Sequence, residues 1–213
     1  MKSFVYFFLV YLNLIKPKYK ISHEINFGSN VANSFFIESL KKSVFYLEYG
    51  SGSSTILADR LNKEFLSVES DTNFYNFLSK QIKEKNKIIL RGFGLSGDFS
   101  TPLLFNFRKY FLRNKALKYS ADVLENLENN KKIPDLILVD GRYRVLCALK
   151  LYDFFKEKKN FPLIILDDYE TREYYKILEK FYKIRLVGRL GVIEGFVEND
   201  TKNFIRKYSL DCR

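Results

Sequence analysis

Acidic residues follow four short apolar runs of the chain, each of which has the character of a buried strand. These acids are Glu48, Glu69, Asp140, Asp167 and Asp168. In a doubly wound sheet, ligands bind outside the carboxyl ends of the strands, where the strand order reverses. One acid at such a place can simply cap the next helix, but its recurrence after four strands indicates a shared polar site.

The first of these runs leads into the turn Tyr49-Gly50-Ser51-Gly52-Ser53-Ser54. Gly50 and Gly52 let the backbone turn sharply and approach a ligand closely, and the helix that follows offers free N–H groups. A dinucleotide-binding fingerprint would need a third glycine where Thr55 stands, so NAD and FAD are poor candidates.

Two acids near this turn indicate the kind of ligand. Glu48 precedes the glycines, where its charge would repel dinucleotide phosphates but would favour a cationic sulfonium or amine. Glu69 comes 21 residues later. That is the spacing at which a carboxylate accepts hydrogen bonds from ribose hydroxyls.

Apolar runs alternate with helical patterns along most of the chain, which predicts right-handed βαβ units. We expect strands at 44–47, 64–69, 87–90, 135–140, 163–166, 184–187 and 191–197, and helices at 34–42, 55–61, 72–83, 143–158 and 170–182. The predicted fold is α/β, a doubly wound and mostly parallel sheet with helices on both faces. Residues 34–213 would form this domain, with a lid or insertion at 92–132.

Residues 1–33 are predicted to form an apolar N-terminal helix and the segment that leads into the domain. The apolar stretch Phe4–Leu12 has a lysine on either side but lacks a small-residue cleavage site, and it is shorter than the roughly 20 residues that span a bilayer. We expect a docked helix in a cytoplasmic protein, with peripheral membrane contact left open through Phe4, Phe7, Phe8 and Leu9.

The composition excludes several function classes. Two cysteines and one histidine rule out a zinc-finger framework and a disulfide scaffold, and make a catalytic triad with histidine very improbable. The net charge is +11, but the lysines are scattered along the chain, so dedicated nucleic-acid binding is not expected. A nucleic-acid enzyme would instead have a basic surface clustered beside the strand ends.

Three motifs together resemble class I S-adenosylmethionine-dependent methyltransferases of a Rossmann-like fold. They are the turn from Leu47 to Thr55, the strand end Ser67-Val68-Glu69-Ser70-Asp71, and the strand Asp135–Gly141 with Arg142-Tyr143-Arg144 after it. The resemblance covers roughly residues 34–187. Ser54 departs from the pattern, since many members carry a third glycine there.

The resemblance implies a site for S-adenosylmethionine. Glu48, Gly50 and Gly52 would bracket its methionine part, Glu69 would bind its ribose, and Asp98 would lie on the adenine side. The implied cofactor-binding set is Glu48, Gly50, Ser51, Gly52, Ser54, Glu69 and Asp98.

A second resemblance, to catechol-type and macrocin-type O-methyltransferases, implies a Mg²⁺ site. In those enzymes one Asp after the fourth strand and an Asp-Asp or Asp-Asn pair after the fifth hold the metal. Here Asp140 is followed by Asp167 and Asp168, 27 and 28 residues later. Alternatively, Arg142 or Arg144 neutralises these acids without a metal.

The implied activity is methyl transfer to a hydroxyl or amine of a small molecule or glycan, with Asp140 and Arg142 as the catalytic residues. Correct positioning of the acceptor would supply most of the catalysis. The alternative is a non-catalytic binding or assembly protein that keeps the fold and has lost turnover.

Overall fold

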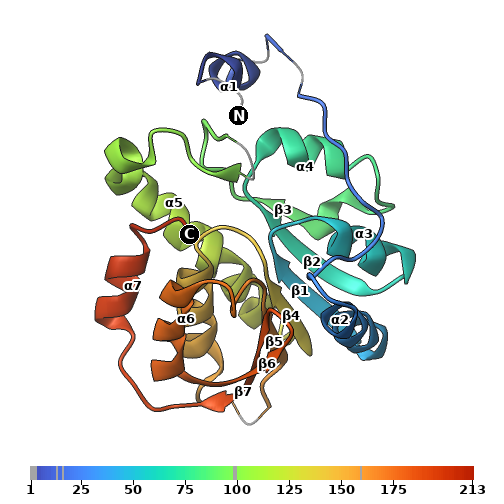
Figure 1. Ribbon diagram of the computed structural model, residues 1–213, viewed down its shortest axis with the longest axis vertical. Coiled ribbons are helices and arrows are strands. Elements are labelled where there is room, and N and C mark those ends of the chain that lie inside the picture. The colour runs from blue at the N-terminus through green and yellow to red at the C-terminus, as the bar shows by residue number, and fades with distance from the viewer. Residues whose placement is uncertain (1–3, 13, 16, 98–99, 159) are drawn as a thin grey trace.

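The computed structural model describes residues 4–12, 14–15, 17–97, 100–158 and 160–213. Their strands form one seven-stranded sheet in the order β3-β2-β1-β4-β5-β7-β6 (Figure 1). Strands β1 to β5 are parallel, and β7 runs antiparallel to both β5 and β6. The strands are β1 (Phe45–Tyr49), β2 (Glu64–Glu69), β3 (Ile88–Leu90), β4 (Leu136–Val139), β5 (Leu163–Leu166), β6 (Tyr182–Val187) and β7 (Leu190–Phe196). The predicted fold class, a doubly wound and mostly parallel Rossmann-like sheet, is confirmed.

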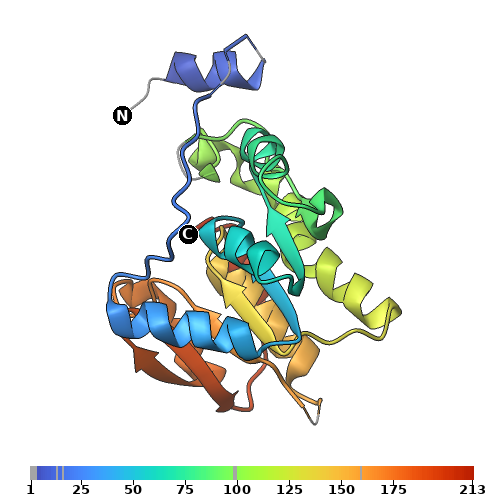
Figure 2. The same ribbon diagram turned by 90° about the vertical axis from the view of Figure 1, so that its right-hand side faces the viewer.

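Helices cover both faces of the sheet, because its central strands are apolar on both sides. Every residue of β1 and β4 is buried, as expected of parallel strands packed between two helical layers. One face packs against α2 (Asn30–Lys42), α3 (Ser53–Arg60) and α4 (Thr72–Leu78). The other packs against α5 (Phe105–Asn129), α6 (Arg144–Phe155), α7 (Lys202–Tyr208) and the 3₁₀ helix η3 (Glu173–Lys180). Figure 1 shows the sheet between the two helical layers, and in Figure 2 α2 and α3 lie in front of the sheet.

Helix boundaries follow local capping more than apolar spacing. Helix α2 begins at Asn30, earlier than predicted, because the Ser29 side chain accepts a hydrogen bond from the Ala32 N–H. Asp71 caps α4 by accepting from the Asn73 and Phe74 N–H groups. The segment predicted as a helix at 170–182 contains the shorter η3, and helix α7 was not predicted.

The region predicted as a lid or insertion contains the long helix α5. Its residues Leu112, Ala116, Tyr119, Val123 and Leu127 are buried in the core that α6 completes. This helix is therefore part of the helical layer on one face of the sheet. Within 92–132, only the loop before α5 could act as the predicted lid.

The N-terminal helix α1 (Phe4–Tyr11) lies at one end of the molecule, above the carboxyl ends of the strands (Figure 1). An extended segment connects it to α2 (Figure 2). Of the described side chains in α1, only that of Val10 is buried. Within the described residues, no helix has the length and apolar character that crossing a membrane requires.

Candidate functional site

The site forms where the strand order reverses, between β1 and β4. The turns after these strands touch, and the Asp140 N–H donates to the Tyr49 carbonyl at 2.9 Å. Gly50 has φ of +93°, and a Cβ on it would lie 2.5 Å from the Cα of Gly141. Only glycine satisfies both conditions. Gly52 is different: its φ is −179°, and a Cβ there would have no neighbour within 4 Å.

A cavity of about 720 Å³ opens at this edge of the sheet. Its walls come from the turn after β1, the end of β2, the loop after β3, the turns after β4 and β5, and the N-terminal segment with α1. Among the lining residues are Tyr6, Phe7, Lys18, Tyr19, Lys20, Ser51, Glu69, Asp71, Gly97, Asp140, Arg142, Arg144, Asp167 and Arg189. Its position matches the ligand-binding crevice of doubly wound sheets.

Glu48 lies behind the glycine turn and does not line the cavity. It is fully buried, and its carboxylate accepts hydrogen bonds from the hydroxyls of Tyr46 at 2.7 Å, Ser54 at 2.5 Å, and Thr55. Burial raises the pKa of Glu48 against the effect of these donors. The structure therefore gives Glu48 and Ser54 the task of holding the start of α3 against β1, in place of the direct contact with a ligand that we expected for Glu48.

Glu69 lines the cavity at the end of β2. Its Oε1 accepts from the backbone N–H groups of Ser70 at 2.6 Å and Asp71 at 2.7 Å, and its Oε2 accepts from that of Ser51 at 3.2 Å. Burial raises the pKa of Glu69 to about 7 although these donors favour the charged form. Because a carboxylate oxygen has two lone pairs, Oε2 can accept a further hydrogen bond from the cavity.

The far wall beyond Glu69 is aromatic. The Tyr19 ring packs edge-on against that of Phe74 at 5.3 Å between centroids, and its hydroxyl lies 3.4 Å from an Asp71 oxygen. Asp98, which we predicted on this side, lies outside the described residues.

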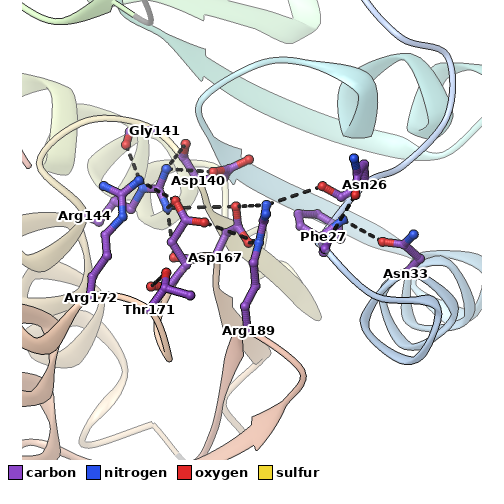
Figure 3. Close-up of polar contacts among 12 residues, drawn as sticks. Asn26, Phe27, Asn33, Asp140, Gly141, Arg144, Asp167, Thr171, Arg172 and Arg189 are labelled. Atoms are coloured by element: carbon purple, nitrogen blue, oxygen red, sulfur yellow. Dashed lines mark hydrogen bonds and ion pairs between the residues drawn. The ribbon is translucent and has the colours of Figure 1, made fainter.

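Arg144 ties the carboxyl ends of β4 and β5 together (Figure 3). Its guanidinium is buried, and it donates to the carbonyl oxygens of Asp140, Gly141 and Asp167 at 2.8–3.1 Å. It also forms ion pairs with the carboxylates of Asp140 at 2.9 Å and Asp168 at 3.2 Å. The five contacts use the full donor fork of an arginine.

Arg189 comes from the tight turn between β6 and β7 and holds Asp167 in a bidentate ion pair at 2.7 and 2.8 Å. It also donates to the Asn26 carbonyl at 3.3 Å, which links the N-terminal segment to the sheet (Figure 3). Arg172 pairs with Asp168 at 2.5 Å.

Three arginines thus replace the predicted metal. Asp140, Asp167 and Asp168 do come together, but each forms an ion pair with a guanidinium. Among the residues that the structure describes, no three His, Cys, Asp or Glu side chains are placed to hold a metal ion. The structure does not support the predicted magnesium site: as placed here, the acids do not fit the metal, because their charge is already neutralised.

Asp140 and Arg142, the two predicted catalytic residues, differ in their ion pairs. The Asp140 side chain remains 34% exposed towards the cavity beside Arg144. Burial and the nearby Asp167 carboxylate raise the pKa of Asp140, while Arg144 opposes that change. Burial and the charge of Arg144 lower the pKa of Arg142, whose half-buried side chain forms no ion pair with a described residue.

Sequence reasoning missed Arg172 and Arg189. Arg189 reaches Asp167 because β7 inserts between β5 and β6, and no local pattern indicates that topology. Lys18, Tyr19 and Lys20 were missed too, because nothing in their sequence shows that the N-terminal segment returns over the cavity.

Comparison with solved structures identifies the architecture. A methyltransferase-like protein from Silicibacter pomeroyi superimposes with a TM-score of 0.71, covering 89% of this chain and 100% of that protein at 23% identity. The two chains share one fold. No protein-family model and no curated protein sequence matches this chain.

Proposed function

We propose that this protein is an S-adenosylmethionine-dependent methyltransferase that acts on a hydroxyl or amine of a small molecule or glycan. One observation carries the proposal: Glu69 and the Gly50 turn lie side by side in the cavity at the reversal of strand order. The methyltransferase-like fold supports it.

The residues around Glu69 fit the cofactor. The free lone pair of Glu69 would accept a ribose hydroxyl, and the tight approach of Gly50 to Gly141 keeps side chains out of the space beside it. Tyr19 and Phe74 would contact the adenine. When bound, S-adenosylmethionine would supply an electrophilic methyl group on a positively charged sulfur.

Asp140 is the residue best placed to accept the proton that an acceptor hydroxyl or amine loses. A base works best when its pKa is near the working pH, and burial moves Asp140 in that direction. Arg144 fixes the orientation of the Asp140 carboxylate through their 2.9 Å ion pair. Metal assistance is not part of this proposal.

The cavity favours an acceptor that carries negative charge. Of its four described acids, Asp140 and Asp167 are paired with arginines, whereas Glu69 and Asp71 accept hydrogen bonds from backbone N–H groups. Lys18, Lys20 and Arg142 also line it, and none of them forms an ion pair within the described part of the chain. An anionic group on the acceptor would supply the missing partner for these cations. Arg142 follows Asp140 by two residues in the turn after β4.

The affinity for S-adenosylhomocysteine should depend on pH through Glu69. The ionised carboxylate accepts a hydrogen bond from a ribose hydroxyl better than the protonated acid does, and its pKa in the free protein is about 7. Binding should therefore tighten between pH 6 and pH 8, by up to about tenfold for one group that must be ionised. Calorimetric titration at both pH values measures this.

The matched control is Glu69→Gln, which keeps the shape of the side chain and removes its titration. Its affinity should change much less between pH 6 and pH 8. If the variant kept the pH dependence of the wild type, Asp140 or the ligand itself would be responsible, and Glu69 would not be the ribose ligand.

A further inference from the structure

Most of the large hydrophobic side chains that are exposed among the described residues lie at one end of the molecule. Fifteen large hydrophobic side chains are exposed among the described residues, and ten of them belong to two segments. The first segment is α1 with the residues just after it, and the second is the start of α5. The ten are Val5, Phe8, Tyr11, Leu12, Leu14, Ile15, Leu104, Phe107, Tyr110 and Phe111. We call them the α1–α5 face.

Helix α1 has no polar side. Its sequence FVYFFLVY contains no charged residue, yet among its described side chains only Val10 is buried in the fold. A helix that is apolar all round belongs in a core or a membrane. Its eight residues extend for about 12 Å, too little to cross a bilayer of about 30 Å. Another apolar phase must therefore cover its outer surface.

The two segments lie beside each other. Phe7 of α1 and Leu103 both lie next to Gly97, where a Cβ would be 3.6 Å and 3.0 Å from their side chains. Figures 1 and 2 both show α1 and the start of α5 at the same end of the molecule. Phe107 and Phe111 are four residues apart, so they lie on one side of α5, and they are 81% and 84% exposed.

Two longer stretches of the sequence, which contain these segments, carry most of the excess charge. Residues 1–23 and 99–121 hold nine Lys and Arg residues and no Asp or Glu. They therefore account for nine of the eleven net positive charges of the chain. The lysines are spread along the sequence, as we noted, but the acids are missing from the parts that flank the α1–α5 face.

We propose that the α1–α5 face binds the surface of a membrane that contains anionic lipids. Exposed aromatic and aliphatic side chains would enter the boundary between head groups and acyl chains, and the surrounding lysines and arginines would bind lipid phosphates. This arrangement places α1 parallel to the surface without spanning it.

Two other partners fit the face less well. Single-stranded nucleic acid stacks on aromatic rings, but Val5, Leu12 and Leu14 offer no ring for a base. A second copy of the chain would bring two acid-free basic segments together, and like charges repel.

Membrane binding would also orient the cavity. Tyr6, Phe7, Val10 and Tyr11 of α1 line it, so its mouth would face the lipid. The membrane proposal does not rest on the proposed methyl transfer, and each can fail without the other.

Flotation of the full chain with lipid vesicles tests the proposal. We expect binding to phosphatidylcholine vesicles with 30% phosphatidylglycerol, and at least tenfold weaker binding to pure phosphatidylcholine. F107S/F111S should lower the partition coefficient at least tenfold. K115E/K118E should remove the preference for phosphatidylglycerol, because both lysines are exposed on the same side of α5.

Matched controls exist elsewhere on the surface. V31S/V44S removes two side chains that are 68% and 73% exposed, and K42E/K202E reverses two exposed charges, all outside the α1–α5 face. Both controls should float like the wild type, and thermal melting should show that every variant is folded.

Three results would overturn the proposal. One is no flotation with either kind of vesicle. Another is tight binding of a single-stranded oligonucleotide that F107S/F111S abolishes while vesicles are ignored. The third is a dimer in sedimentation velocity that the same variant dissociates, again without vesicle binding.

Discussion

Replacing Gly50 with alanine should destabilise the protein and abolish binding of S-adenosylhomocysteine. The new Cβ would lie 2.5–2.9 Å from backbone atoms of Asp140 and Gly141, which no side-chain rotation can relieve. Alanine is also strained at φ of +93°. Together these effects should cost about 2–5 kcal/mol of the free energy of unfolding, measured by urea denaturation.

Gly52→Ala is the internal control for this prediction. Gly52 has an extended backbone and open space around its Cα, so the change should stay within about 0.5 kcal/mol. Equal destabilisation by the two substitutions would show that the contact between the turns after β1 and β4 does not constrain the fold as described.

Arg144→Met should be the most destabilising substitution of a charged side chain in the site. It would leave three buried or partly buried carbonyl oxygens and the carboxylate of Asp140 without their donor, and Met fills a similar volume without replacing any hydrogen bond. Removing one partner of such a buried network typically costs about 3–5 kcal/mol in the free energy of unfolding.

Arg185→Met is the control for this prediction, because it shows how much the loss of any ion-paired arginine lowers the free energy of unfolding. Arg185 pairs with Glu194 at 2.5 Å, but both side chains are about half exposed, so the cost should be about 0–1 kcal/mol. The account of Arg144 as the link between β4 and β5 would be contradicted if the two variants unfolded at the same urea concentration.

The sheet could be predicted from the sequence because its strands are local signals. β1, β4 and β5 are short, mostly apolar runs: Glu48 lies near the end of β1, and acids directly follow β4 and β5. β2 and β5 have the predicted bounds. The position of Gly50 followed from the same signal, since a turn after a buried strand at the switch point needs close backbone approach.

The details of the site could not be predicted, because they depend on contacts between distant parts of the chain. Glu48 belongs to the expected motif, but only the packing of α3 shows that its carboxylate accepts three hydroxyls behind the turn. The acids after β4 and β5 were expected to converge, and they do. Arg189 forms an ion pair with Asp167 although it lies 22 residues later, in the β6–β7 turn, so local sequence could not show that an arginine neutralises this acid.

The N-terminal segment shows the same limit. Its apolar character was plain, and a docked helix was the prediction. What the sequence could not show is that Tyr19 would pack against Phe74 in the wall of the cavity while Val5, Phe8 and Tyr11 of α1 stayed exposed. Those contacts connect a segment of the N-terminus with elements that follow much later in the chain.

The central claim is tested most directly by calorimetric titration of the wild-type protein with S-adenosylhomocysteine and, in a separate titration, with NAD. We predict saturable binding of S-adenosylhomocysteine, no measurable binding of NAD, and a loss of about 1–3 kcal/mol in binding free energy for Glu69→Ala. No heat with S-adenosylhomocysteine, or binding of NAD in its place, would contradict the proposed methyltransferase.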